Sequence, residues 1–481
     1  MREYQQYIGG QWTSSGEMFD DLDPYRGTVM ARVPAGTRAD AAQAVDAAAA
    51  AFPGWADLPP AGKQALFLRA ADIVERRAEE ITALLATETG CAAAFAGFQV
   101  LTATRLLRQA ANWGYLPAGE VIRSDMPGTF ALALRRPLGV VAGISPWNGA
   151  HVLAWRTVVN PVAFGNTVVL KPSEEAPVSA GLLVAEIMAE AGFPPGVINV
   201  ITHAPGEATP VADEFFSRPE VRCINFTGSS ATGRILAERA GRALKRCVLE
   251  LGGYNPLIVL SDADLDYAVE ATAFAAFFHS GQICMNARKV LVERPVYNAF
   301  ITRLTARAQA LPAGDPADPG TVIGPLITPA ALARVASDVD EAVAAGAKVL
   351  TGGSADGPCY RPTILADVPD GARIHSEETF GPVLVAQPVQ DADEAVTIAN
   401  STRYGLSAGL ITSDNQRGFA LARRIDAGVV HVNDQTIADE PQLPLGGVKD
   451  SGWGRSGPQS MADFTELQWI TTRDGTGTYP I

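Results

Sequence analysis

The fold is decided by residues 139–174, GVVAGISPWNGAHVLAWRTVVNPVAFGNTVVLKPSE. We predict a strand, a helix and a second strand in succession along this stretch. The runs GVVAGI (139–144) and NTVVLK (166–171) are short, apolar and continuous, which is typical of strands buried on both faces of a parallel sheet. A helix between two such strands forms a βαβ unit. The stretch therefore predicts a parallel sheet with its connections packed against it.

Residues 137–170 carry a single charge, Arg156, so the stretch must also be tested as a membrane span. Four polar or helix-breaking residues interrupt it: Pro146, Asn148, Asn160 and Pro161. A lipid-facing helix tolerates such a run poorly, because the bilayer offers no partner for freed backbone groups. We therefore expect a buried strand, loop and helix of a soluble protein.

The alternation of strand and helix continues beyond this stretch. Helices are predicted from Pro177 to about 190, from Ser229, and over 265–279, 296–310, 329–345, 392–400 and 415–426. Further strands are INVIT (198–202), CINF (223–226), KVLVE (289–293), LVAQPV (384–389), GLIT (409–412) and VVHV (429–432). This order indicates an α/β fold with mainly parallel sheets.

The N-terminal part is predicted to be helical, and two strands stand apart from the main pattern. Thr37 with Asp40 forms a capping box for a helix over 38–52, and a second helical stretch covers 61–86. The isolated strands are GTFALALRRP (128–137) and FTELQWITTR (464–473). Such strands often pair with another domain or another subunit.

Composition excludes several classes of protein. The chain has 481 residues, of which 47% are hydrophobic, and its formal net charge is −14. An acidic balance argues against nucleic acid or an anionic membrane as the main partner. The five cysteines show neither CxxC pairs nor the spacing of a metal site, so no metal is expected. The first residues contain no apolar run of signal-peptide length, and we expect a cytoplasmic protein with reduced thiols.

Cys284 is the cysteine with unusual surroundings. It lies in HSGQICMNARKV directly after a helix, and Gly281 permits close approach of another backbone or a ligand. A thiolate in this position is a candidate nucleophile, although a buried inert thiol fits the residues as well. None of the five histidines has a recognisable context as its partner.

Three other segments suggest ligand contacts. Glu250 ends an apolar strand before Gly252, where α/β enzymes keep functional groups, but a solvated strand end fits equally. Gly228 and Ser229 lie between a strand and a helix, whose N-terminus offers N–H groups to a pyrophosphate. The KPSE turn (171–174) offers the side chains of Lys171 and Glu174 to ribose hydroxyls. A charged loop between a strand and a helix, without a ligand, fits these residues equally. GWGRSG (452–457) matches a dinucleotide spacing by chance, since no strand precedes it.

Seven segments together resemble the ordered motif set of the aldehyde dehydrogenase superfamily. The resemblance covers nearly the whole chain, from YIGGQW near the start to the C-terminal strand. The segments are SPWN (145–148), GNTVVLKPSE (165–174), FTGS (226–229), ELGG (250–253), GQIC (281–284), EETFGPV (377–383) and PLGG (444–447).

The resemblance implies a catalytic mechanism. Cys284 matches the nucleophile that attacks the aldehyde carbon, and its backbone N–H with the Asn148 amide matches the oxyanion site. Glu250 matches the general base that activates water for thioester hydrolysis. The resemblance also implies NAD as the cofactor. NADP is the weaker alternative, because the Glu174 carboxylate would repel its 2′-phosphate. The implied cofactor contacts are Ile144, Trp147, Lys171, Glu174, Gly228, Ser229, Gly252, Glu378 and Phe380.

The family's architecture implies three parts. Residues 1–117 and 138–249 match a Rossmann-type NAD-binding domain, and 250–445 match an α/β catalytic domain. Residues 118–137 and 446–481 match a small β arm through which the family forms homodimers or homotetramers.

The segments around 431–447 resemble the benzaldehyde, salicylaldehyde and vanillin dehydrogenase branch, which implies an aromatic aldehyde. The implied substrate contacts are Leu153, Arg156, Trp453 and Leu445. Leu445 replaces a usual Phe and Gly149 is small, so a wider pocket is expected. Three alternatives remain: a semialdehyde or aliphatic aldehyde dehydrogenase, in which Arg156 binds a carboxylate, a non-catalytic homologue, and a cysteine esterase.

Overall fold

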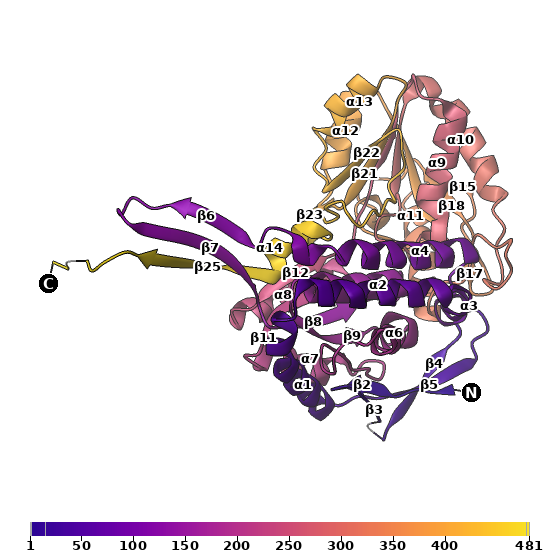
Figure 1. Cartoon of the computed structure of the whole chain (residues 1–481). Helices are drawn as coiled ribbons and strands as arrows, with labels where there is room; N and C mark the ends of the chain where they lie inside the picture. The colour runs from indigo at the N-terminus through magenta and orange to yellow at the C-terminus, as the bar shows by residue number, and fades with distance from the viewer. Residues whose placement is uncertain (1, 15, 478, 481) are drawn as a thin grey trace.

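The computed structural model describes residues 2–14, 16–477 and 479–480. Its lower lobe contains an eight-stranded sheet in the order β24-β12-β11-β8-β9-β10-β2-β3 (Figure 1). The inner strands run parallel: β8 (Val140–Ser145), β9 (Thr167–Pro172), β10 (Ile198–Val200), β11 (Val221–Thr227) and β12 (Arg246–Glu250). The edge strands are antiparallel: β2 (Gln6–Ile8), β3 (Gln11–Thr13) and β24 (Gly452–Trp453).

The strand–helix–strand prediction for residues 139–174 is confirmed. Strands β8 and β9 pair in parallel register and are joined by α5 (Ala150–Ala163). Every residue of α5 is buried except Arg156, which is half-buried. A helix that is apolar on all sides is therefore an interior helix of this lobe and not a membrane span. No helix in the described part of the chain is long and apolar enough to cross a bilayer.

The N-terminal helices cover this sheet, and two of their predicted boundaries are wrong. Helix α1 (Arg38–Ala56) continues through Pro53, since the buried Trp55 anchors its last turn by donating to the carbonyl oxygen of Val162 at 3.0 Å. The stretch predicted as one helix over 61–86 is two helices, broken at Arg77. Arg77 there forms ion pairs with several glutamates. The helices are α2 (Pro60–Arg76), α3 (Ala78–Thr89), α4 (Ala93–Ala110), α6 (Leu183–Ala191), α7 (Ala208–Ser217) and α8 (Ser230–Arg242).

The upper lobe contains a seven-stranded sheet in the order β15-β18-β19-β14-β13-β21-β22, parallel except for β15 (Figure 1). Its strands are β13 (Leu257–Val259), β14 (Lys289–Glu293), β15 (Lys348–Thr351), β18 (Thr363–Ala366), β19 (Val383–Val389), β21 (Ser407–Ile411) and β22 (Val429–Val432). Its helices are α9 (Leu265–Phe277), α10 (Arg294–Gln309), α11 (Pro329–Ala344), α12 (Ala392–Asn400) and α13 (Asn415–Ala422). The α/β class predicted from the sequence is thus confirmed.

The two isolated strands pair with each other. Strand β25 (Thr465–Arg473) is antiparallel to β7 (Thr129–Pro137) over their whole length, and β6 (Gly119–Arg123) completes a three-stranded arm. This arm projects away from both lobes (Figure 1). It exposes several large apolar side chains: Val121, Ile122, Phe130, Leu467, Trp469 and Ile470.

Smaller elements complete the fold. Three short strands form an N-terminal sheet: β1 (Arg2–Glu3), β4 (Met18–Leu22) and β5 (Val29–Pro34). Two pairs are β16 (Ala355–Asp356) with β17 (Cys359–Tyr360), and β20 (Tyr404–Gly405) with β23 (Val448–Lys449). Short helical turns cover Trp113–Tyr115, Val178–Leu182, Phe278–Gly281, Arg373–His375, Pro458–Ser460 and Met461–Phe464.

Candidate active site

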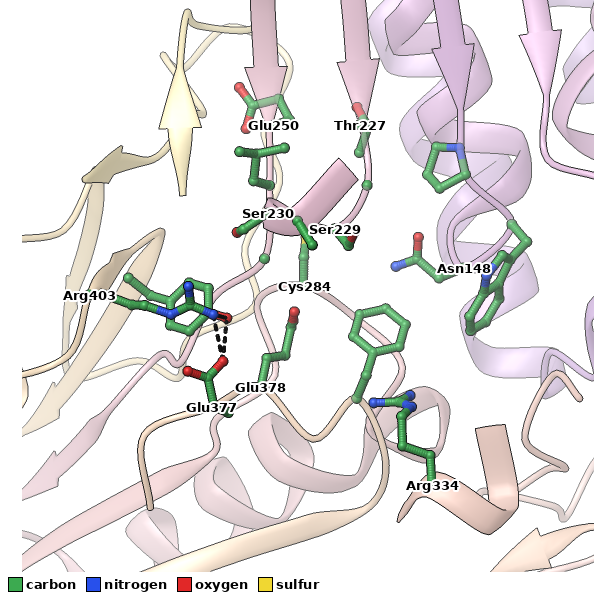
Figure 2. Close-up of a pocket in the computed structure, with 18 of the residues that line it drawn as sticks. Asn148, Thr227, Ser229, Ser230, Glu250, Cys284, Arg334, Glu377, Glu378 and Arg403 are labelled. Atoms are coloured by element: carbon green, nitrogen blue, oxygen red, sulfur yellow. Dashed lines mark hydrogen bonds and ion pairs between the residues drawn. The ribbon is translucent and has the colours of Figure 1, made fainter. Parts of the chain in front are cut away.

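Two cavities meet at Cys284. The first, which we name the cleft, lies past the carboxyl ends of β8, β11 and β12 and is lined by residues of both lobes (Figure 2). The second, the apolar pocket, is lined mainly by hydrophobic residues of α4, α5 and the segment after β22. The residues that line both are Asn148, Thr227, Glu250, Leu251 and Cys284.

The backbone that presents Cys284 has an unusual conformation. His279, Ser280 and Gly281 all have positive φ, at 52°, 53° and 67°. A Cβ at Gly281 would lie 2.0 Å from the carbonyl oxygen of Gly381, so glycine is required there. The side-chain amide of Asn255 donates to the carbonyl oxygen of Cys284 at 2.7 Å. Strained backbone held by surrounding structure is common where a reactive side chain must be positioned.

Asn148 lies beside this loop. It follows β8 at the start of α5, is 7% exposed, and its Nδ2 donates to the carbonyl oxygen of Gln282 at 2.9 Å. Its amide is directed towards the side of the cavity where Cys284 lies (Figure 2). The cleft therefore has an amide donor on the side where Cys284 lies, and its oxyanion role remains a prediction.

Glu250 ends β12 and faces both cavities. Its Oε1 atom is buried and has no hydrogen-bond partner among the described residues. Burial raises the pKa of Glu250 to about 8, while the positive charges of Arg156 and Arg455 act in the opposite direction. A carboxyl group with this pKa exchanges protons near neutral pH, which suits a general base.

The thiol of Cys284 is protonated at neutral pH in the ligand-free protein. Burial, and then the nearby carboxyl groups of Glu378 and Glu250, raise the pKa of Cys284 to about 12. A thiolate is the reactive form of cysteine. The thiol proton must therefore move to an acceptor before Cys284 reacts, and Glu250 lines the same two cavities.

The cleft has the features expected of a dinucleotide site. Helix α8 begins there, and Ser229 caps it by accepting from the backbone N–H of Thr232 at 3.1 Å. A Cβ at Gly252 would lie 2.3 Å from Oε2 of Glu378, so glycine keeps that space open. Glu378 accepts weakly from the N–H of Gly253, and its burial raises its pKa to about 7. The N–H groups of α8 and the Glu378 carboxylate fit a pyrophosphate and ribose hydroxyls respectively.

The remaining cofactor candidates lie in three places. Gly228, Trp147 and Phe380 line the cleft, and the rings of the last two meet edge to face at 5.6 Å. Ile144, contrary to expectation, packs into the hydrophobic core at the end of β8 and does not line the cleft. Lys171 lies at the end of the neighbouring strand β9.

Lys171 has a partner that was not predicted. Its Nζ atom lies 2.5 Å from Nε2 of His203, and Nδ1 of His203 donates to the carbonyl oxygen of Ala204. Oε2 of Glu174 lies 3.6 Å from the same Nε2 atom. Burial lowers the pKa of Lys171 to about 8 and that of His203 to about 4. His203 follows the INVIT strand, but its contact with Lys171 forms across the fold and has no local signal in the sequence.

The apolar pocket contains three of the four predicted substrate contacts, namely Leu153, Arg156 and Leu445. The prediction for Trp453 is wrong, because its strand β24 pairs at the outer edge of the sheet. Trp453 is 51% exposed and donates to the carbonyl oxygen of Cys247 at 3.0 Å. It lines a separate depression beside α8.

Sequence reasoning also missed part of the pocket wall. Phe95 and Phe98 come from α4, a helix that was not predicted from the sequence. Asp439 forms an ion pair with Arg156 across the wall, and each side chain is 11% exposed. Asp439 lies in the segment that carried the resemblance to aromatic aldehyde dehydrogenases, but its charge was given no role.

Comparison with known proteins agrees with this geometry. Residues 12–470 match the aldehyde dehydrogenase family. A vanillin dehydrogenase of Pseudomonas fluorescens is 44% identical over 98% of both chains. A salicylaldehyde dehydrogenase structure from Pseudomonas putida G7, complexed with salicylaldehyde, has a TM-score of 0.97 at 38% identity and full coverage of both chains. An NAD-dependent aldehyde dehydrogenase structure from Sinorhizobium meliloti has a TM-score of 0.95 at 34% identity and covers 99% of this chain and 96% of that one. The chain therefore belongs to the aldehyde dehydrogenase family and is an NAD(P)-dependent oxidoreductase that acts on aldehydes.

Proposed function

We propose that the chain oxidises an aromatic aldehyde to the carboxylic acid, with NAD as the electron acceptor. The observation that carries the proposal is the position of Cys284, where a cleft suited to a dinucleotide meets an apolar pocket. A nucleophile at such a junction contacts an aldehyde from one side and a hydride acceptor from the other. The enzymes named for vanillin and salicylaldehyde, at 44% and 38% identity, support an aromatic substrate.

The pocket wall supports the same choice. Phe95 and Phe98 lie side by side in the wall with their rings stacked at 5.8 Å, and aliphatic side chains such as Leu153 complete it. Aromatic rings bury large areas and pack favourably against one another. When it binds in this pocket, an aryl aldehyde therefore buries more apolar surface away from water than a short aliphatic aldehyde does.

The first half-reaction forms the bond between sulfur and carbon. The proton of Cys284 first passes to solvent water, which leaves the thiolate. The thiolate then attacks the aldehyde carbon, and the carbonyl π electrons move to oxygen. Asn148 and the backbone N–H of Cys284 donate hydrogen bonds to this oxyanion, which is where preorganised donors accelerate the reaction most.

The second half-reaction oxidises and releases the product. NAD, held in the cleft, would supply the acceptor for the hydride that leaves the former aldehyde carbon. The oxyanion collapses to a carbonyl as the hydride leaves, so Cys284 carries a thioester. Glu250 then takes a proton from water, the hydroxide adds to the thioester carbon, and the carbon–sulfur bond breaks. The carboxylic acid departs, the Cys284 thiolate is restored, and Glu250 releases its proton to solvent water before the next turnover.

The proposed cofactor contacts come from the cleft and from the KPSE turn at the end of β9. Gly228, Ser229 and the first turn of α8 would hold the pyrophosphate, and Glu378 a ribose. Lys171 and Glu174 would hold the other ribose, whose free 2′-hydroxyl suits a carboxylate better than the 2′-phosphate of NADP does. NAD is therefore proposed, with NADP as the weaker alternative.

The division into domains and the assembly are part of the proposal. The boundaries are an NAD-binding domain over 1–117 and 138–249, a catalytic domain over 250–445, and an arm over 118–137 and 446–481. We propose that the arm joins copies of the chain into a homodimer or homotetramer. Its exposed apolar residues and the free outer edge of β25 support this.

The experiment is a measurement of NADH formation by purified protein with NAD and a substrate panel. The panel is benzaldehyde, vanillin, salicylaldehyde, succinic semialdehyde and hexanal, with Cys284→Ala as the control. Aryl aldehydes with the largest kcat/KM would support the proposal. A larger kcat/KM for hexanal or the semialdehyde would refute the aromatic assignment and leave the dehydrogenase mechanism standing.

A further inference from the structure

The apolar pocket has a charged pair in its wall. Arg156, the half-buried residue of α5, donates from Nη2 to Oδ2 of Asp439, which follows β22. Each side chain is 11% exposed, so the pair is mostly shielded from water. Among the described residues that line the pocket, the basic and acidic ones are Arg156, Asp439 and Glu250.

The pair removes the free positive charge that an arginine would otherwise offer. A carboxylate on the substrate would have to displace Asp439 from Arg156 and lie in a pocket that also contains Glu250. Truncating one partner of a buried ion pair leaves the other charge uncompensated, at a large cost. The same cost opposes any substrate that separates Asp439 from Arg156.

An uncharged substrate meets no such opposition. Among the described residues, the hydrogen-bond partner of the Arg156 guanidinium group is Asp439, which accepts from Nη2. The guanidinium group carries five N–H donors in all, so donors remain for a hydroxyl, methoxy or amide oxygen on the substrate. An aldehyde with a neutral oxygen substituent can thus use Arg156 while Asp439 stays in place.

We propose that Asp439 is a specificity-determining residue. By neutralising Arg156 it excludes aldehydes that carry a carboxylate and favours those that carry an uncharged substituent. This inference rests on the proposed dehydrogenase function, and it narrows the substrate class of the same site.

The test compares substrates that differ in charge and little in shape. The aromatic pair is 4-carboxybenzaldehyde and 4-formylbenzamide, and the aliphatic pair is succinic semialdehyde and butanal. NADH formation gives kcat/KM for each substrate with wild-type protein and with Asp439→Asn and Asp439→Ser. Circular dichroism checks that each variant is folded.

The matched control is Glu440→Gln. Glu440 is the exposed neighbour of Asp439, and its carboxylate accepts from the side chain of Gln442 at 2.6 Å. This control removes the same negative charge one residue away and leaves the contact with Arg156 intact. It therefore separates a local effect of the pair from a general effect of net charge.

In wild-type protein we expect the uncharged member of each pair to have a kcat/KM at least about tenfold higher. In Asp439→Asn and Asp439→Ser that ratio should fall about tenfold or reverse, because Arg156 is then free to bind the carboxylate. Glu440→Gln should keep the wild-type ratio.

Two results would overturn the inference. One is a wild-type enzyme that uses the carboxylated substrates as well as their uncharged partners, a result that requires no variant to fold. The other is a folded Asp439 variant whose ratio matches that of Glu440→Gln. If the aliphatic pair is oxidised faster than the aromatic pair, the aromatic assignment fails, yet the charge preference within the aliphatic pair still decides the role of Asp439.

Discussion

The side-chain amide of Asn148 is bonded to the backbone of the loop that carries Cys284: its Nδ2 atom donates to the carbonyl oxygen of Gln282 at 2.9 Å. One N–H of the amide is thereby fixed, and the geometry of the second N–H relative to the sulfur is set with it. Asn148 comes from the lower lobe and Gln282 from the loop after α9, so this bond aligns groups from the two lobes.

Replacing Asn148 with Ala should lower kcat by about 10²–10³-fold, which is the usual effect of removing one oxyanion donor. The KM for the aldehyde should change little, because the amide acts on charge that develops only during the reaction. Steady-state NADH formation by the folded variant measures both. Asn160→Ala is the control, since Asn160 is a buried amide of α5 outside both cavities. Equal losses in kcat from both variants would count against an oxyanion role.

Glu250→Gln should separate the two half-reactions. The amide cannot take a proton from water, so thioester hydrolysis should slow by about 10²-fold or more while hydride transfer still occurs once. Stopped-flow recording should show a burst of NADH close to one equivalent of enzyme, then a slow steady state. Absence of the burst would mean that Glu250 acts before hydride transfer, by removing the thiol proton of Cys284.

The pH dependence of the wild-type steady state follows from the same residue. Burial raises the pKa of Glu250 to about 8, so the group is mostly protonated at neutral pH and gains its basic form as pH rises. Arg156 and Arg455 oppose this shift, and Asp463 and Asp439 reinforce it. The hydrolysis-limited rate should therefore increase with pH and level off above about pH 8. A rate that is flat from pH 6 to 9 would show that another group limits hydrolysis.

The catalytic candidates were readable from the sequence because each ends a strand or follows a glycine turn in a short contiguous motif. Asn148, Glu250 and Cys284 come from well-separated segments. Asn148 and Glu250 lie at the carboxyl ends of strands of one parallel sheet, and the loop after α9 brings Cys284 to the same cavity. Asp439 and His203 were missed for the opposite reason. Their significance depends on the single residue that each contacts across the fold, and no local pattern encodes that contact. The prediction that Trp453 contacts substrate failed because Trp453 lies on β24, and the pairing of β24 with β12 at the outer edge of the sheet determines where its ring lies.

Glu174→Ser should weaken discrimination between NAD and NADP. Its carboxylate suits ribose hydroxyls and repels a 2′-phosphate, so the ratio of kcat/KM for NAD over NADP should fall by about tenfold. Glu207→Ser is the control, because Glu207 is exposed on the adjacent loop. Initial rates with both cofactors at a fixed aldehyde concentration give the ratio. An unchanged ratio would reject the ribose contact.

Trp469→Glu should dissociate the assembly. Trp469 is 78% exposed on β25, the outer strand of an arm that also exposes the apolar side chains of Leu467 and Ile470. Burying an unpaired carboxylate in an interface built from these side chains is costly, so the variant should elute at a lower mass. Light scattering coupled to size-exclusion chromatography measures the mass. Phe419→Glu, on α13 far from the arm (Figure 1), introduces the same charge at a residue that is 65% exposed and should leave the mass unchanged.

Gly149→Phe should narrow the range of aldehydes. Gly149 lines the apolar pocket, and a Cβ there would lie 3.1 Å from Cδ1 of Leu153, so a benzyl group must extend into the space used by substrate. We expect kcat/KM for 2-naphthaldehyde to fall about tenfold more than that for benzaldehyde, because the larger ring system loses the room it needs. The flexible Leu153 side chain can move aside, which should allow the variant to fold. Equal losses for both aldehydes would mean that the new ring disturbs Asn148 and Cys284 rather than the pocket, and the wide entrance would then have no part in selecting the substrate.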